Sequence, residues 1–95
     1  MSHQTKATSF TARLWRYPGP GGWVFVHVPS KYAPPVTSGF GRTPVRAIVD
    51  GTEWSTSTWR DRKHGVLLAV PKRVRGKKGA GDEVKVTIAL DTERL

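Results

Sequence analysis

Apolar residues recur at every second position in four short segments of the chain. The alternation runs over residues 10–15, 23–28, 45–49 and 83–90, and it is clearest in the last of these. A period of two places successive side chains on opposite faces of a β-strand. We therefore predict a strand over each segment. In residues 23–28, the valines lie on one face, and Trp23, Phe25 and His27 lie on the other.

Two further segments complete the predicted strands. Residues 52–59 alternate tryptophan and hydroxyl side chains, and residues 66–70 form a short apolar run. Asp50-Gly51 lies between two β-rich segments, and both residue types tolerate the positive φ angles of a type I′ turn. This dipeptide predicts a hairpin. The total is about six strands.

Proline and glycine mark the connections between these strands. Residues 17–22 hold two prolines and three glycines, which predicts a turn. Residues 30–43 predict an irregular excursion without a helix, of a length that often serves binding. Pro71 suits the first position of a helix and Gly76 suits its end, so we predict one short helix near 71–76.

Short strands with a turn about every ten residues are typical of a small barrel. We predict an all-β fold, a closed or nearly closed β-barrel of about six strands with one short helix. Residues 1–7 are predicted to be a loose lead-in and residues 8–95 to be a single domain. Because these strands suffice to close a barrel alone, a monomer is favoured over a homodimer.

The amino-acid composition excludes several kinds of site and indicates a class of partner. The 95 residues include no cysteine, which excludes disulfides, thiolate zinc sites and thiol catalysis. No apolar run approaches the length of a membrane span and the first residues are polar, so a cytoplasmic location is expected. Sixteen basic residues against seven acidic ones give a net charge of +9, which attracts polyanions such as DNA or RNA.

Half of the positive residues lie in one stretch, from Arg60 to Lys78. Clustered cations suffice for non-specific affinity to a phosphate backbone. The alternative is an ordinary solvated turn and helix, and one strand would hold the two basic ends roughly 15 Å apart. The predicted phosphate-contacting residues are Lys72, Arg73, Arg75, Lys77 and Lys78, assisted by Arg60 and Trp59.

Four tryptophans are many for this length. Small barrels commonly fill their interior with aromatic side chains, and we expect this of Trp23 and Trp54. Trp15 and Trp59 fall on the outward faces of their strands and lie beside arginines, so they are open to either packing or base stacking.

No catalytic or metal site is predicted. The hydroxyls of Ser55 to Thr58 would need an activating base, and no nucleophile-elbow motif accompanies His27 or His64. The three histidines lack metal-ligand spacing. We expect no catalytic residue, metal or cofactor.

Several segments resemble a known family in order and spacing. They are Phe10, residues 23–29, Val45 with Gly51-Thr52, residues 55–58, Val70-Pro71-Lys72 and residues 81–84. Together they resemble the small bacterial family called domain of unknown function 1905, which implies a small β-barrel and no assigned activity. Residues 70–86 are also similar to the half-barrel of AbrB-type regulators, which bind DNA as dimers through basic residues.

Three hypotheses follow. The first is a non-catalytic binding module with nucleic acid as partner. The second is a barrel that binds a small ligand or a protein, motivated by the excursion at 30–43. The third is a hydrolase that uses Ser55 or Ser57 with a histidine.

Overall fold

The structure is a computed structural model that describes residues 7–34 and 41–94. Most of the predicted lead-in and the middle of the predicted excursion therefore lie outside the described residues. The strands are β1 (Thr8–Arg13), β2 (Trp15–Arg16), β3 (Val24–Val28), β4 (Arg42–Val49), β5 (Thr52–Asp61), β6 (Gly65–Ala69) and β7 (Glu83–Leu90). The helices are α1 (Lys72–Arg75) and two 3₁₀ turns, η1 (Ser30–Tyr32) and η2 (Thr92–Arg94).

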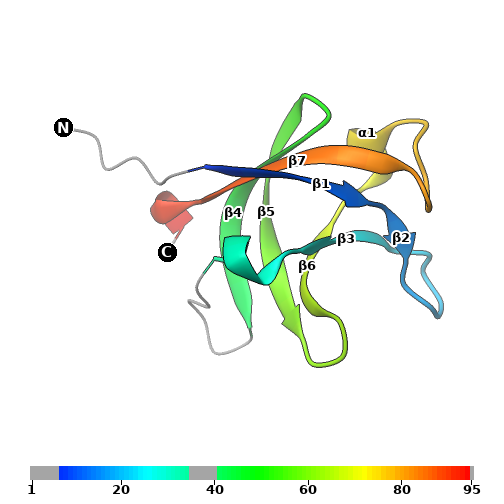
Figure 1. Cartoon of the computed structure of the whole chain (residues 1–95), viewed down its shortest axis with the longest axis horizontal. Coiled ribbons are helices and arrows are strands. Elements are labelled where there is room, and N and C mark those ends of the chain that lie inside the picture. Colours follow the sequence, from blue (N-terminus) through cyan, green and yellow to red (C-terminus); the bar gives the residue numbers. More distant parts are fainter. Residues whose placement is uncertain (1–6, 35–40, 95) are drawn as a thin grey trace.

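All seven strands form one antiparallel sheet in the order β1-β7-β4-β5-β6-β3-β2. The first and last strands of this order are successive parts of the same chain segment. β1 pairs with β7, and β2, which begins two residues later, pairs with β3. The two ends of the sheet therefore meet through this segment, and the sheet curls into a nearly closed barrel (Figure 1). The predicted fold is confirmed; the strand count rises to seven because the first predicted strand is divided.

Leu14 is the residue at which that segment changes partner. Its N–H donates to the Asp82 carbonyl at 2.8 Å, and its own carbonyl accepts from Gly81 N–H at 2.8 Å. Its side chain is 1% exposed and belongs to the core. The apolar side chain thus anchors the bend that closes the barrel.

The core lies between the inward faces of the strands. Val26, Val45 and Val86 are fully buried, and Trp54 fills a larger volume among them. Val74 of α1 is also buried, so the short helix covers one end of the barrel. The helix follows Pro71 and ends at Gly76, whose φ of 60° suits glycine.

The connection at residues 30–43 differs from its prediction in two ways. Residues 30–32 form the short turn η1, and β4 begins at Arg42, before the expected start. Pro44 is compatible with this longer strand because the β4–β7 ladder ends at Val45. Only the carbonyl of Pro44 is used there, as acceptor for Asp91 N–H at 3.0 Å.

The predicted hairpin at Asp50-Gly51 is confirmed. The two φ angles are 48° and 91°, as a type I′ turn requires. The Asp50 carboxylate also accepts hydrogen bonds from Lys78 Nζ at 2.7 Å and from Lys85 N–H at 2.9 Å. Both hydrogen bonds hold the pKa of Asp50 below its ordinary value. The bond from Lys78 has the larger effect, and the bond from Lys85 N–H has the next largest. The turn is thereby tied to β7 and to the segment after α1.

Candidate binding face

The outer face of β2 and β3 carries a continuous set of rings. The Trp15 ring lies 5.5 Å from Tyr17 and 5.8 Å from Phe25, centroid to centroid. His27 meets the Trp15 ring edge-on at 5.0 Å, and His64 lies 5.2 Å from it. Trp15 and Phe25 occupy paired positions of neighbouring antiparallel strands, so their side chains point to the same side of the sheet.

Leu67 lies beneath the rings of this aromatic cluster. Its neighbour Leu68 pairs with Val26 and lies in the core, so the alternation of a strand turns Leu67 outward. Leu67 is nevertheless only 2% exposed. It pairs with His27 on one side and Trp59 on the other, beneath the rings. The outer face therefore holds a second apolar cluster, separate from the barrel core.

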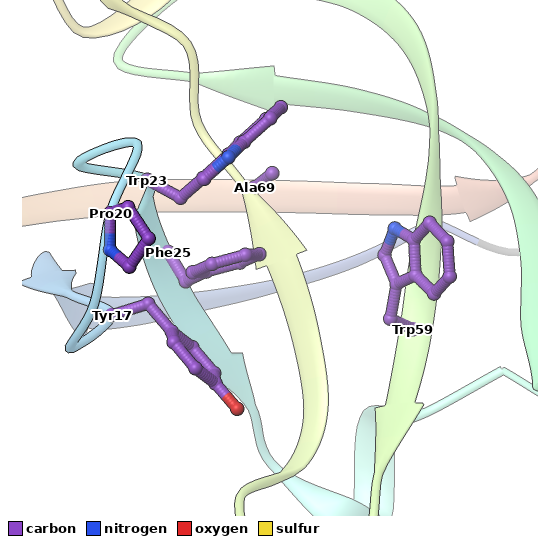
Figure 2. Close-up of a pocket in the computed structure, with 6 residues that line it drawn as sticks. All are labelled: Tyr17, Pro20, Trp23, Phe25, Trp59 and Ala69. Carbon is purple, nitrogen blue, oxygen red and sulfur yellow. The ribbon is translucent and has the colours of Figure 1, made fainter.

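Two tryptophans border this cluster and remain largely exposed. Trp23 is 62% exposed and Trp59 is 42% exposed. Figure 2 shows them on either side of Ala69, whose small side chain leaves a hollow between them. The hollow has a volume of about 270 Å³ and is lined by Tyr17, Pro20, Trp23, Phe25, Trp59 and Ala69. A neighbouring hollow of about 230 Å³ shares Tyr17, Phe25 and Trp59 and adds Arg60, Asp61 and Leu67.

The structure agrees with the predicted placement of Trp54 but not with that of Trp23. Trp54 is 7% exposed and lies in the core, as expected. The core placement of Trp23 is wrong, because β3 buries its valines and presents Trp23, with Phe25 and His27, outward. Trp59 lies outward. Trp15 also lies on the outer face, but its ring is partly covered and its indole N–H is buried without a hydrogen-bond partner.

Cations lie at the borders of the aromatic face. The Arg42 guanidinium carbon is 4.5 Å from the ring centroid of Trp59. Arg16 pairs with the core residue Val24, so its side chain lies on the opposite side of the sheet from Trp15 and not on this face. Arg60 lines the smaller hollow. Asp61 is the only acidic residue in the lining of these two hollows, and its carboxylate is bonded to the imidazole of His64.

The basic residues predicted from the sequence do not form one cluster. Trp59 and Arg60 pair with Leu67 and Val66 of β6, and α1 begins five residues after Leu67. An extended chain of that length spans about 16 Å. Figure 1 shows α1 at the end of the barrel opposite the β5–β6 turn. The structure therefore separates Arg60 and Trp59 from the basic helix.

The five predicted cations of α1 and of the turn after it, here called the helix cations, also differ among themselves. Lys78 binds Asp50 and the Glu83 carbonyl, and Arg75 donates to the carbonyls of Val70 and Lys78. These contacts hold the helix onto the barrel. Lys72, Arg73 and Lys77 are exposed and make no ion pair with a described residue. Three of the five predicted helix contacts are therefore available to a phosphate.

Ser55 and Ser57, the candidate nucleophiles, lie on β5. Arg46 donates a hydrogen bond of 3.5 Å to Ser55 Oγ, and no hydrogen bond described for residues 7–34 and 41–94 joins either serine to a histidine. The imidazole of His64 is bonded to Asp61. Within the described chain, no three residues of types that bind metals gather into a group that could hold an ion. None of its helices is long and apolar enough to cross a bilayer.

These features define a small all-β barrel with an aromatic, arginine-bordered outer face. A family model described as domain of unknown function (DUF1905) matches residues 10–88, most of the chain, and the chain belongs to this family. No curated protein matches the sequence.

Proposed function

We propose that this protein is a non-catalytic module that binds single-stranded nucleic acid on the outer aromatic face. The observation that carries the proposal is the pair of exposed tryptophans, Trp23 and Trp59, on either side of a hollow and bordered by arginines. Unpaired bases stack on exposed aromatic rings, and each stacked base contributes about 1–3 kcal/mol. A duplex hides its base faces and would lose this contribution.

The arrangement of the rings supports stacking over ordinary packing. Leu67, Trp15 and Phe25 already form a tight apolar base, which fixes the positions of the outer rings. Trp23 lies 6.5 Å from Phe25 at an interplanar angle of 27°, so its ring stacks beside that of Phe25. A platform held in place before binding loses little side-chain entropy when a base stacks on it.

The charges support a polyanion as the partner. Arg42 and Arg60 lie beside the rings of the face, and the carboxylate of Asp61 is bonded to the imidazole of His64. Arginine both stacks on aromatic rings and pairs with phosphate oxygens. Barrels that bind single strands commonly bind a length of about 4–16 nucleotides. A strand of that length can also extend to α1 and the turn after it, where Lys72, Arg73 and Lys77 are exposed.

Titration of the protein with fluorescein-labelled dT₁₂ tests this function. Tryptophan fluorescence should be quenched by the oligonucleotide, and the apparent affinity should fall with salt. With one phosphate contacted by each of Arg42, Arg60, Lys72, Arg73 and Lys77, the slope of log K against log salt should be about −3.5. A hairpin duplex of equal length should bind at least tenfold more weakly. Equal affinity for both, or no binding in 20 mM salt, would show the proposal to be wrong.

The hollow between Trp23 and Trp59 favours a second candidate, a planar aromatic small molecule. Its lining is almost entirely apolar, and Ala69 leaves room for one ring system. A thermal-shift series with free bases, nucleosides and flavins tests this function. Stabilisation by a small ligand without any binding of dT₁₂ would favour the second candidate over the first.

A further inference from the structure

The turn between β5 and β6 places two exposed cations at one end of the aromatic face. Three residues connect Asp61 to Gly65, which form the last pair of the β5–β6 ladder. Arg62 and Lys63 are exposed, and neither forms an ion pair with a described residue. Both belong to the basic stretch of the sequence, but neither was among the predicted phosphate contacts. We call residues 60–64 the basic turn.

Asp61 closes the basic turn. Its carboxylate accepts a hydrogen bond of 3.1 Å from the backbone N–H of His64, and it is also bonded to the imidazole Nδ1 of that residue. Aspartate commonly stabilises turns by such local bonds to the backbone. Arg62 and Lys63 lie between the two bonded residues, so their backbone is held at both ends.

His64 attaches the basic turn to the aromatic face. Its ring lies 5.2 Å from the ring of Trp15 and 5.0 Å from that of Tyr17. His64 directly precedes β6, whereas Trp15 belongs to β2, which is two strands away in the sheet. The contact therefore requires the turn to bend toward the outer face. Asp61 also lies on this face, where it lines the smaller hollow.

The exposed ring of Trp59 lies close to the basic turn. The pair Trp59↔Leu67 is two residues along the ladder from Asp61↔Gly65, which corresponds to about 7 Å. In the other direction, α1 begins about 16 Å from Leu67 along an extended chain. The basic turn is therefore the nearer of these two groups of exposed cations to Trp59.

We propose that the basic turn is a phosphate clamp for the single strand bound on the aromatic face. Arg62 and Lys63 contact the phosphates, and Asp61 and His64 are positioning residues that hold the turn beside the rings. This inference rests on the proposed function and adds the end of the face at which the phosphate backbone is bound. When a base stacks on Trp59, the adjoining phosphate on the side of the turn lies toward the two cations. Because the turn is held before binding, little conformational entropy is lost there.

A double variant measures the contribution of the two cations. Each phosphate contact on a single strand contributes about −0.7 to the slope of log K against log salt. Two contacts added to the five counted above steepen the expected slope for dT₁₂ from about −3.5 to about −5. An Arg62→Gln, Lys63→Gln variant should therefore return the slope to about −3.5 and lower the affinity in 20 mM salt.

An Arg16→Gln, Lys85→Gln variant is the matched control, because it removes the same charges from exposed residues away from the aromatic face. Arg16 lies on the opposite side of the sheet from Trp15, and Lys85 lies on β7. This control should keep a slope of about −5. An equal change of slope in both double variants would show that net charge sets the slope, and it would overturn the clamp.

Substitutions of Asp61 test the positioning role by the sign of their effect. Loss of a carboxylate beside a polyanion would by charge alone raise the affinity. Because Asp61 holds the turn, Asp61→Ala should instead weaken dT₁₂ binding by about twofold to tenfold, the cost of ordering one long side chain on binding. Asp61→Asn removes the same charge but keeps an oxygen that accepts from His64 N–H, so it should bind at least as tightly as the parent protein. Tighter binding by the alanine variant would overturn the positioning role.

NMR of the parent protein provides a readout that needs no variant. In ¹H–¹⁵N spectra, the amide signals of Arg62 and Lys63 should shift with dT₁₂ but not with thymidine, which carries a base and no phosphate. A shift of the Trp59 indole signal with dT₁₂ while the turn signals stay in place would overturn the clamp and leave the proposed function standing. Absence of any dT₁₂ binding would overturn both.

Discussion

Arg42 and Trp59 occupy paired positions on β4 and β5, and the guanidinium carbon of Arg42 lies 4.5 Å from the centroid of the indole. A cation in this position is attracted by the ring electrons of the indole. Trp59 remains 42% exposed, so Arg42 contacts its ring without covering it. This pair places a positive charge beside an exposed aromatic ring.

Trp59→Ala should weaken dT₁₂ binding by about 5-fold to 150-fold, the range expected for one stacked base. Fluorescence anisotropy of labelled dT₁₂ measures the change. Trp59→Tyr, which keeps a stacking ring, should retain most of the affinity. A thermal unfolding midpoint within a few degrees of the parent protein would show that the fold is intact. Unchanged affinity of the alanine variant would remove Trp59 from the site.

Trp23→Ala should weaken binding to a similar extent with a smaller effect on stability than loss of the core Trp54. Trp23 is 62% exposed, whereas Trp54 is 7% exposed. Truncation of a buried tryptophan costs about 3–5 kcal/mol, so Trp54→Ala should be strongly destabilised. Urea denaturation of both variants measures the difference. Similar destabilisation of the two would contradict the outward placement of Trp23.

Replacement of the three exposed helix cations by glutamine separates the two basic regions. A Lys72→Gln, Arg73→Gln, Lys77→Gln variant should make the slope of log K against log salt less steep, with only a modest loss of affinity for dT₁₂. Arg42→Gln and Arg60→Gln together should weaken binding more, since these arginines lie beside the rings. Salt titrations of both variants provide the measurement. The reverse order would place the main site at α1.

Leu67→Ala should destabilise the protein by about 2 kcal/mol, at the lower end for a buried leucine. Leu67 is 2% exposed, but the rings above it lie at the surface and can settle into the space. Leu68→Ala, in the enclosed core, should cost more. Guanidinium denaturation monitored by circular dichroism compares the two. The same Leu67 variant should also weaken dT₁₂ binding, because it loosens the floor beneath the platform.

The ion pair between Asp50 and Lys78 predicts a pH dependence of stability. The pKa of Asp50 is lowered in the folded protein, chiefly by its hydrogen bond to Lys78. Its contribution to stability is therefore present above the pKa of the unfolded chain and is lost as the pH falls through the lower, folded value. Because both side chains are partly exposed, the pair is worth less than about 1 kcal/mol.

Lys78→Met should therefore reduce stability at pH 7 and reduce the further loss on acidification. The pKa of Asp50, followed by NMR of its carboxyl carbon, should rise toward its ordinary value. Lys77→Met, beside it, is the matched control and should leave the pKa of Asp50 unchanged. An unaltered Asp50 titration in Lys78→Met would show that the backbone N–H of Lys85 alone sets this pKa.

The sequence by itself determined the strands, the hairpin and the short helix. These features depend on neighbouring residues: alternation shows a strand, Asp50-Gly51 shows a turn, and Pro71 with Gly76 delimits a helix. The partition of side chains within each strand was also available locally. In residues 23–28, the sequence separated the valines from Trp23, Phe25 and His27, and the structure keeps that separation.

Only the tertiary structure decided which of those two faces is inside. Valine and aromatic faces are both apolar, so local pattern assigns neither to the core. In the folded barrel, the compact valines fill the interior. The aromatic rings lie on the outer face, where they cover Leu67. Strand pairing with Trp59 places Arg42 at the binding face, although the sequence did not predict it there. Lys78 was predicted to contact phosphate, but its side chain binds Asp50. Contacts between residues distant in the sequence depend on how the sheet closes, and that closure is set by the whole chain.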